Sequence, residues 1–269
     1  MGWIDLEGAV NVRDVGGLPT VNGRTTRSGV LLRADNLQDL TPRDVTRLVD
    51  ELGLLTVLDL RTTGEVHLEG PGPLRTTDVA HHHLSLIPEQ DESDQAESER
   101  AMEDAVGRAV LDRPSRAADD PTDMTGHYVG YVEEAPQNVA AALRLLADPA
   151  TGTALVHCAA GKDRTGTVVA IALSLAGVTR QAVVADYARS AERIDQVLRR
   201  LQGSRTYGES LEGVPVARVT PQAASMERFL DHVDREYGGP HGLAMSLGVD
   251  EETVARLAAR LVGTSELAR

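Results

Sequence analysis

The stretch TALVHCAAGKDRTGTVVAIALSLAG, residues 153–177, contains the features that decide the fold. Its first part, TALVHC, is a short apolar run typical of a buried strand, and TGTVVAIALSLAG is almost wholly apolar, as a buried helix is. Glycines and charged residues lie between these two parts, and the chain's single cysteine, Cys158, directly follows the apolar run. The stretch therefore predicts a buried strand, a polar loop and a helix that begins near Thr165.

Similar patterns precede and follow this stretch. The runs VLLRADNL near residue 30 and LLTVLDLR near residue 54 predict buried parallel strands with charge at their carboxyl ends. Between them, Thr41 as N-cap, Pro42 at the first helical position and Gly53 as a stop predict a helix. A further strand is expected in DVAHHHLSLI and a helix in QNVAAALRLLAD, followed after the central stretch by three amphipathic helices in RQAVVADYARSAERIDQVLRRL, PQAASMERFLDHVDREYGG and DEETVARLAARLV. This order predicts an α/β fold with a largely parallel central sheet flanked by helices and a helical C-terminal region.

Length and composition indicate one domain. A chain of 269 residues with 41% hydrophobic residues suits a single domain over residues 1–269. From Glu89 to about Pro121 the sequence turns strongly acidic. We expect residues 89–123 to form a mobile, lid-like insertion that is helical at most around residues 95–111.

The charge balance narrows the classes of partner. A formal net charge of -14 supplies no overall basic field, so neither nucleic acid nor an anionic membrane is expected as the main partner. The start MGWIDLEGAV lacks the pattern of a signal peptide, and no apolar run approaches the roughly 20 residues of a membrane span. A lone cysteine also fits a reducing interior. We expect a cytoplasmic protein, with export by another route left open; oligomeric state cannot be deduced from these features.

The loop after Cys158 has the composition of an anion site. Backbone N–H groups from Ala159 to Arg164 can converge on one point, and the first turn of the next helix adds partial positive charge there. The same field, with His157 and Lys162 as neighbours, favours the thiolate form of Cys158. The planar fork of Arg164 can hold two oxygens of a phosphate or sulfate while the sulfur faces the central atom. The predicted phosphate-binding residues are Ala159, Ala160, Gly161, Lys162, Asp163 and Arg164.

The loop has other possible interpretations. A nucleotide P-loop needs a glycine where Val156 stands and a Ser or Thr where Asp163 stands, so we reject it. A purely structural cysteine, packed as a small hydrophobe, leaves the fixed spacing of glycines and cations unexplained. From other functional classes, a phosphate-binding module without turnover and a sulfurtransferase that carries persulfide sulfur stay as alternatives.

The run HCAAGKDRTG resembles the signature of the cysteine-dependent protein tyrosine phosphatases, in which His-Cys is followed by five residues and Arg. It is most similar to an atypical bacterial branch that carries G-K-D-R-T-G, and NVRDVGG, LLRADNL, LDLRTTGEV and VADYARS resemble further motifs of that branch. The resemblance implies the phosphatase fold and a two-step reaction that uses no metal and no cofactor. Our hypothesis is that the Cys158 thiolate attacks phosphorus to form a phosphocysteine while Arg164 and the loop amides hold the oxygens. Water then releases phosphate.

Two residues beside the loop are expected to support the thiol. Thr165 is placed to donate a hydrogen bond to the Cys158 sulfur, or to cap the helix, and the two roles are compatible. In the resemblance His157 tunes the thiolate through backbone geometry rather than acting as a base. A buried structural histidine is an equally good interpretation.

Three further sets of residues are candidates for the surroundings of the loop. Carried over from the branch, Arg13 and Asp14 help to shape the rim of the site, while an ordinary surface ion pair explains them equally well. Asp59 and Arg61 end a strand, where sites gather in open α/β sheets, and are expected to support the loop from behind. Tyr187 is expected to be a packing residue of a helix.

Three carboxylic acids are candidates for the general acid. Related enzymes of the branch place an aspartate just after the strand that corresponds to HHLSLIP, which here points to Glu89 with Asp91 close by. Asp163 is the other candidate, because a carboxylate beside bound phosphate has a raised pKa and can carry a proton. Its alternative role is to orient Lys162 or Arg13 by a salt bridge.

The triplet HHH at residues 81–83 suggests a metal site only weakly. Side chains alternate along a strand, so only His81 and His83 can converge, and no third ligand is evident. We expect no metal.

The substrate is less well specified than the chemistry. By resemblance it is a phosphorylated protein, through tyrosine or dual specificity. The alternatives are a small soluble phosphorylated metabolite, such as a sugar or nucleoside phosphate, and a phosphoinositide.

Overall fold

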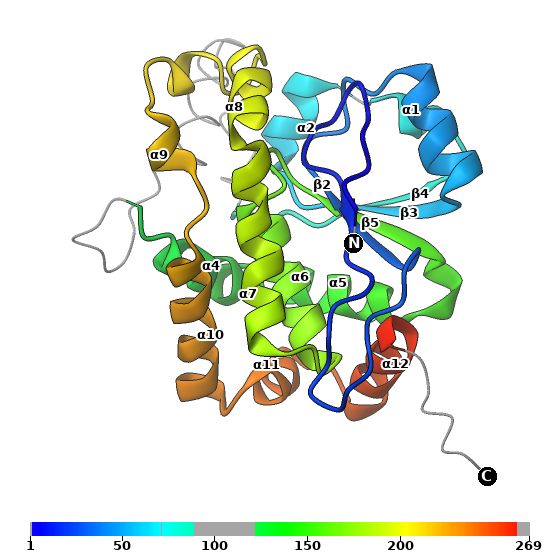
Figure 1. Cartoon of the computed structure of the whole chain (residues 1–269), viewed down its shortest axis with the longest axis vertical. Helices are drawn as coiled ribbons and strands as arrows, with labels where there is room; N and C mark the ends of the chain where they lie inside the picture. The colour runs from blue at the N-terminus through cyan, green and yellow to red at the C-terminus, as the bar shows by residue number, and fades with distance from the viewer. Residues whose placement is uncertain (1, 71, 89–121, 263–269) are drawn as a thin grey trace.

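The computed structural model describes residues 2–70, 72–88 and 122–262. Within these residues five strands form one sheet in the order β1-β2-β5-β3-β4 (Figure 1). The strands are β1 (Arg13–Asp14), β2 (Leu31–Ala34), β3 (Leu54–Asp59), β4 (Ala80–His83) and β5 (Thr153–His157). Only β1 pairs antiparallel, with β2, and the other neighbours are parallel. The predicted α/β fold with a largely parallel sheet is confirmed.

Helices make up most of the rest of the described chain. They are α1 (Pro42–Thr46), α2 (Thr63–Glu69), α4 (Thr125–Glu134), α5 (Pro136–Ala147), α6 (Asp163–Leu175), α7 (Arg180–Ala188), α8 (Ile194–Gln202), α9 (Val216–Val219), α10 (Ala223–Tyr237), α11 (Pro240–Ser246) and α12 (Glu251–Val262). A π-helical turn follows α1, and short 3-10 turns lie at Pro73–Thr76, Pro149–Thr151, Arg189–Arg193 and Glu209–Leu211.

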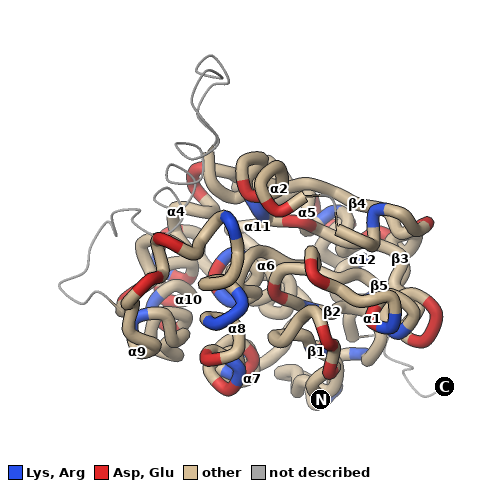
Figure 2. The backbone as a smooth tube through the Cα atoms, turned by 90° about the horizontal axis from the view of Figure 1, so that it is seen from above, with Lys and Arg blue, Asp and Glu red and all other residues tan. Residues whose placement is uncertain are grey.

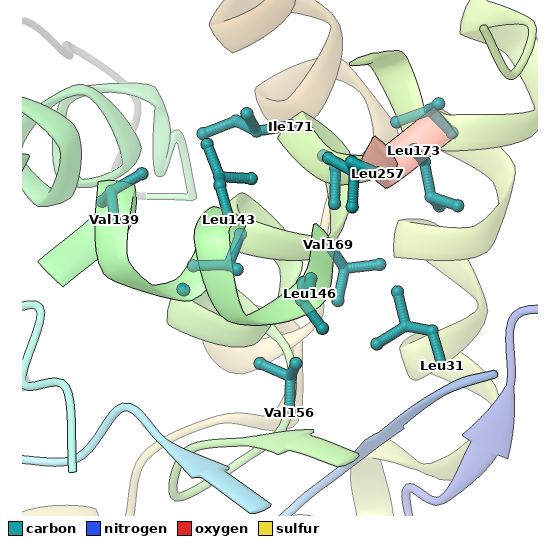
Figure 3. Close-up of a cluster of buried hydrophobic side chains, with 14 of the residues drawn as sticks. Leu31, Val139, Leu143, Leu146, Val156, Val169, Ile171, Leu173 and Leu257 are labelled. Carbon is teal, nitrogen blue, oxygen red and sulfur yellow. The ribbon is translucent and has the colours of Figure 1, made fainter. Parts of the chain in front are cut away.

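The sheet separates two hydrophobic clusters, because side chains alternate along each strand. On β5, Val156 belongs to the larger cluster with α4–α7 and α10–α12, whereas Leu155 belongs to the smaller cluster with the N-terminal segment and the region of α1. Figure 3 shows Val156 and Leu31 from the strands below side chains of α5 and α6. In Figure 1, α1 lies above the sheet and α5 and α12 lie below it. The strand β5 is thus covered on both faces, as its apolar sequence predicts.

The first helix shows how local sequence sets its ends. Thr41 caps α1 through the backbone N–H of Asp44, whose carboxylate accepts the Thr41 backbone N–H in return. Pro42 occupies the first helical position, and the turn after Leu52 uses Gly53 at a φ of 66°. The predicted cap, first residue and stop are confirmed. The α-helix itself ends at Thr46, and a π-helical turn carries the chain on to Glu51.

Several boundaries differ from the sequence-based expectation. The central helix begins at Asp163, earlier than the predicted Thr165. The helix expected over RQAVVADYARSAERIDQVLRRL is in fact α7 and α8, separated by a 3-10 turn at Arg189–Arg193. Helices α2 and α4 were not expected, and the strand in DVAHHHLSLI covers only Ala80–His83. The helix predicted around residues 95–111 lies outside the described residues, as does most of the insertion predicted at 89–123.

Charged residues of both signs are distributed over the described chain (Figure 2). Figure 2 shows basic positions of α8 beside acidic positions of neighbouring segments. Arg200 of α8, for example, forms ion pairs with Asp35 and Asp39. No helix within the described residues combines the length and the apolar character that crossing a membrane requires.

Candidate active site

The loop that contains Cys158 joins β5 to α6 at the carboxyl edge of the parallel strands. Cys158 immediately follows β5 and is only 2% exposed. Gly161 has a φ of 68°, and a Cβ at this position would lie 2.4 Å from the carbonyl oxygen of Ala34. Only glycine satisfies both conditions, so this residue fixes the tight turn of the loop against β2.

The loop carbonyls are held from outside the turn. The carbonyl oxygens of residues 159, 160 and 161 accept hydrogen bonds from Asn36 N (2.9 Å), Asn11 Nδ2 (2.9 Å) and Arg33 Nη2 (2.8 Å), respectively. The backbone N–H groups of residues 159–162, in contrast, have no acceptor among the described residues. They are therefore available to an anion, as the predicted cup requires.

Arg164 is bound by a carboxylate that the sequence analysis did not single out. Its Nη1 lies 2.6 Å from Glu65 Oε2, and its Nη2 lies 2.8 Å from Glu65 Oε1. Nη1 also donates to the carbonyl oxygen of Leu60 at 3.3 Å, whereas Nε has no acceptor in the described chain. Burial alone would lower the pKa of Arg164, but the Glu65 carboxylate raises it well above its usual value. The guanidinium is therefore charged and keeps one edge, Nε and Nη2, for another ligand.

Asp163 lies in a buried hydrogen-bond chain. Its Oδ2 lies 2.8 Å from Lys162 Nζ, and its Oδ1 accepts from the hydroxyl of Tyr128 at 2.9 Å. The Tyr128 hydroxyl also shares a hydrogen bond with the hydroxyl of Tyr187, so Tyr187 does more than pack a helix. Burial alone would raise the pKa of Asp163, but the charge of Lys162 and the hydrogen bonds from Lys162 and Tyr128 outweigh burial and lower it. Asp163 is therefore an ionised partner of Lys162.

Arg13 lies beneath the loop and not on its rim. It is fully buried, and its Nε lies 2.9 Å from Oδ1 of Asp186, whose Oδ2 lies 2.7 Å from Arg33 Nη1. Arg33 then holds the Gly161 carbonyl. Asp14, placed at the rim with Arg13 by the resemblance, instead accepts backbone N–H groups of Gly16 and Gly29 in a turn.

Asp59, Arg61 and His157 form a buried cluster on the other side of the loop. Arg61 Nε lies 2.9 Å from Asp59 Oδ1, and Arg61 Nη1 donates to the Asn36 side chain, whose backbone N–H holds the loop carbonyl of residue 159. His157 lies 3.6 Å from Asp59 through Nε2 and 3.3 Å from the Cys158 carbonyl oxygen through Nδ1. Burial lowers the pKa of His157 to about 4, so its ring is neutral at pH 7. This geometry fits the supporting positions expected for all three.

Thr165 differs from its expected role. It is the third residue of α6, so it is not the N-cap, which is Lys162. Its buried hydroxyl has no hydrogen-bond partner among the described residues and makes no contact with the Cys158 sulfur that meets hydrogen-bond criteria. The prediction of a Thr165 hydrogen bond to the thiol is therefore wrong.

A cavity of about 370 Å³ opens onto Cys158. Lys162, Asp163 and Arg164 line one end of it. The rest of the lining is mixed: Asp123, His127, Tyr131, Tyr207, Ser210 and Arg218 contribute polar or aromatic side chains, and a group of aliphatic side chains comes from α8, α9 and the segment between them. We call this aliphatic group the apolar wall; it consists of Ile194, Val197, Leu198, Leu201, Leu211, Val214 and Val219.

The remaining candidates are Glu89, Asp91 and the histidines of residues 81–83. Glu89 and Asp91 lie outside the described residues. His83 Nε2 donates to the carbonyl oxygen of Arg61 at 2.7 Å, and His81 Nε2 has no hydrogen-bond partner among the described residues. Within residues 2–70, 72–88 and 122–262, no group of three metal-ligating side chains lies together.

Several important residues were missed by sequence reasoning. Glu65 occurs within the quoted motif LDLRTTGEV, but as the third residue after Thr62 it looks like an ordinary capping-box glutamate, and it is that as well. Tyr128 and Tyr207 gave no local signal, because their partners are far away in sequence. Asp186 falls in the quoted VADYARS, where its pairing with Arg13 depends on the packing of α7.

Comparison with known proteins relates the chain to phosphatases. The model of a family described as tyrosine phosphatase family matches residues 4–263. The triple specificity protein phosphatase PtpB of Mycobacterium tuberculosis is 31% identical over 288 residues, covering 96% of this chain and 99% of that protein. A tyrosine-protein phosphatase of Nostoc commune is 26% identical over 228 residues, covering 82% of this chain and 75% of that protein.

Among solved structures, the core catalytic domain of the PP-IP phosphatase SIW14 from S. cerevisiae matches over 85% of this chain and 98% of that one. The TM-score is 0.38 and the sequence identity 15%, values too low to bear on function.

Proposed function

The chain belongs to the tyrosine phosphatase family and is a cysteine-based phosphatase, and from this we propose that it hydrolyses aryl phosphate monoesters, foremost phosphotyrosine, with Cys158 as nucleophile. The observation that carries the proposal is the position of Cys158 beside a cup of unpartnered loop N–H groups in a cavity with an apolar wall. The cup accounts for the phosphate and the wall accounts for the organic group.

The proposed first step is attack of the Cys158 sulfur on phosphorus. A bond forms between sulfur and phosphorus as the bond from phosphorus to the leaving oxygen breaks, and the leaving oxygen takes a proton from a carboxylic acid. The loop N–H groups and the free edge of Arg164 hold the phosphoryl oxygens, whose charge they stabilise in the transition state. Water then attacks phosphorus, the sulfur leaves, and inorganic phosphate departs as the acid recovers its proton.

We assign the general acid to Asp163. It lines the cavity beside Cys158, and its Oδ1 and Oδ2 are held by Tyr128 and Lys162. A phosphate group in the loop adds negative charge next to this carboxylate, which raises its pKa and favours the protonated form. The charge of Lys162 and the hydrogen bonds from Lys162 and Tyr128 lower the pKa of Asp163, and the negative charge of the substrate's phosphate acts against them.

The apolar wall supports an aryl substrate over a sugar or nucleoside phosphate. Asp123, Ser210 and Arg218 in the lining offer polar contacts, but sugar hydroxyl groups that face the aliphatic wall would lose hydrogen bonds to water, which costs free energy. An aromatic ring instead buries apolar surface there. Because Cys158 is buried, a phosphate can reach it only at the end of a group that is long enough to enter the cavity.

The test compares substrates across a variant of the wall. Leu201 is a partly buried member of the wall, so Leu201→Ala should raise KM for a phosphotyrosine peptide by about tenfold while the inhibition constant of inorganic vanadate stays unchanged. The matched control is Leu55→Ala, which truncates a leucine of β3 that is 54% exposed and outside the cavity. A higher kcat/KM for sugar phosphates than for the peptide, or equal loss on both classes in Leu201→Ala, would reject an aryl substrate.

A further inference from the structure

We propose that Tyr207 is a positioning residue for Arg164: its hydroxyl orients the Glu65 carboxylate that grips the arginine, while its ring lines the cavity that takes the substrate. The inference rests on the proposed function, since it concerns the same site. Tyr207 would connect the cavity, where the organic group of the substrate binds, to Arg164, which holds the phosphate.

The first observation is that both carboxylate oxygens of Glu65 accept two hydrogen bonds each. Its Oε1 accepts from Arg164 Nη2 at 2.8 Å and from the Tyr207 hydroxyl. Its Oε2 accepts from Arg164 Nη1 at 2.6 Å and from the Thr62 backbone N–H at 2.7 Å. The carboxylate is completely buried, so these four donors replace all of its water. Each oxygen has one donor from Arg164 and one from elsewhere, and Tyr207 supplies the second donor of Oε1.

The second observation is how firmly Tyr207 itself is placed. It is 2% exposed and packs with Ala159, Leu198 and Leu211 in a small hydrophobic cluster. Its backbone N–H donates to the Ser204 hydroxyl at 3.2 Å, and its carbonyl accepts from Leu211 N at 2.9 Å. A side chain anchored in this way has little freedom to lose when it bonds to Glu65.

The third observation is chemical: the Tyr207 hydroxyl can only donate to Glu65. Burial, with the nearby Glu65 charge, raises the pKa of Tyr207 well above its usual value, so the hydroxyl stays protonated. An ionised carboxylate offers lone pairs and no proton. The hydrogen bond is therefore charge-assisted and keeps one direction throughout the pH range of an assay.

The consequence concerns the free edge of Arg164. Glu65 holds the end of the guanidinium, and the orientation of the carboxylate fixes the plane in which Nε and Nη2 face the loop. Without the Tyr207 donor, Oε1 has one partner fewer and the carboxylate can rotate. The hydrogen bonds from Arg164 to the phosphoryl oxygens are then less well aligned in the transition state, where a small misplacement lowers the rate strongly.

The experiment compares Tyr207→Phe with the natural protein in phosphate release from p-nitrophenyl phosphate. The variant keeps the ring in the cavity and removes only the hydroxyl. We expect kcat to fall by about tenfold with KM changed little, because the loss falls on the transition state. Tyr237→Phe, which removes a hydroxyl at the end of α10 away from the cavity, serves as control and should leave kcat unchanged.

A second readout separates positioning from mere packing. The charged and titratable groups facing Glu65 are Arg164, Arg61 and Tyr207, and the Tyr207 hydrogen bond is one cause of the lowered Glu65 pKa. Its removal should move the acidic limb of the kcat/KM profile to higher pH. In a Glu65→Gln background, Tyr207→Phe should cost much less than it does alone, since both act through one carboxylate.

Three outcomes are informative. The expected result is the loss in kcat, the shift of the acidic limb and the non-additivity with Glu65→Gln. A Tyr207→Phe protein with the kcat and pH profile of the natural protein would overturn the proposal. Full additivity of the effects of Tyr207→Phe and Glu65→Gln on kcat would also overturn it, and this comparison can be made even if either variant is less stable. If the natural protein releases no phosphate at all, the proposed function fails. The affinity of Tyr207→Phe for vanadate then tests the positioning of Arg164 by itself. An affinity equal to that of the natural protein would overturn the positioning role of Tyr207.

Discussion

The two terminal nitrogens of Arg164 face the two carboxylate oxygens of Glu65, at 2.6 and 2.8 Å, with both side chains at most 3% exposed. This pair joins the start of α6 to α2 and leaves the Nε edge of the arginine for phosphate. A buried pair of this kind is costly to break, because the remaining partner keeps its charge without compensation.

Replacement of Glu65 by Gln should therefore affect both folding and catalysis. We expect a loss of about 3–5 kcal/mol in the free energy of unfolding and a fall in kcat/KM of at least about tenfold. Urea unfolding and steady-state kinetics measure the two effects. The control is Glu51→Gln, which breaks an exposed ion pair with Arg47 and should cost less than about 1 kcal/mol. Equal stability of the two variants would show that the buried pair is not important for the fold.

Gly161→Ala tests the turn of the loop. The alanine would have to adopt a φ of 68° and would also place its Cβ 2.4 Å from the Ala34 carbonyl oxygen. Gly23→Ala is the matched control, because Gly23 has a φ of 78° with nothing within 4 Å of the added Cβ. We expect the control to cost about 1–2 kcal/mol and Gly161→Ala to cost more and to abolish turnover. Thermal unfolding and phosphate release provide the comparison, and similar losses in both would mean that the contact with Ala34 is unimportant.

The buried neutral His157 predicts a pH dependence of stability. Burial lowers its pKa from 6.5 to about 4, so below pH 6.5 the unfolded chain binds a proton that the folded chain does not. The stabilising effect is complete above pH 6.5 and is lost as the pH falls toward 4, by about 3 kcal/mol in all. Urea unfolding at several pH values should show this slope. It should be flatter in His157→Asn, and an unchanged slope in that variant would assign the effect to other groups.

The general acid can be identified from leaving groups. Asp163→Asn and Glu89→Gln are compared on aryl phosphates whose phenols have graded pKa values. Loss of the true acid should reduce kcat most for the poorest leaving groups, since these need the proton. We expect this pattern for Asp163→Asn. A uniform loss across the series would exclude Asp163 as the acid, and the graded pattern in Glu89→Gln would transfer the role to Glu89.

The sheet and the loop were predictable because their signals are local. An apolar run, a glycine-bearing turn and an apolar helix are contiguous in residues 153–177, and the cap of α1 lies within four residues of its partner. The split between α7 and α8 was not predictable in this way. Its amphipathic pattern continues through Arg189–Arg193, and only packing against the rest of the fold shows the break.

The partners of the loop residues were harder to predict for the same reason. Cys158 and Arg164 belong to one short motif, whereas Glu65 is 99 residues from Arg164, and Tyr207 is 142 residues from Glu65. Arg13 shows the opposite error. A polar pair between turn residues suggested a surface position, but tertiary packing buries this arginine against Asp186.

The central claim is that Cys158 performs metal-independent hydrolysis of a phosphate monoester. The most direct measurement is phosphate release from p-nitrophenyl phosphate and a phosphotyrosine peptide in the presence of EDTA, with Cys158→Ser alongside. We predict turnover that survives EDTA and vanishes in the variant, and a phosphocysteine trapped by acid quench in the natural protein. Undiminished turnover by Cys158→Ser, or tight binding of vanadate without any phosphate release by the natural protein, would contradict the account.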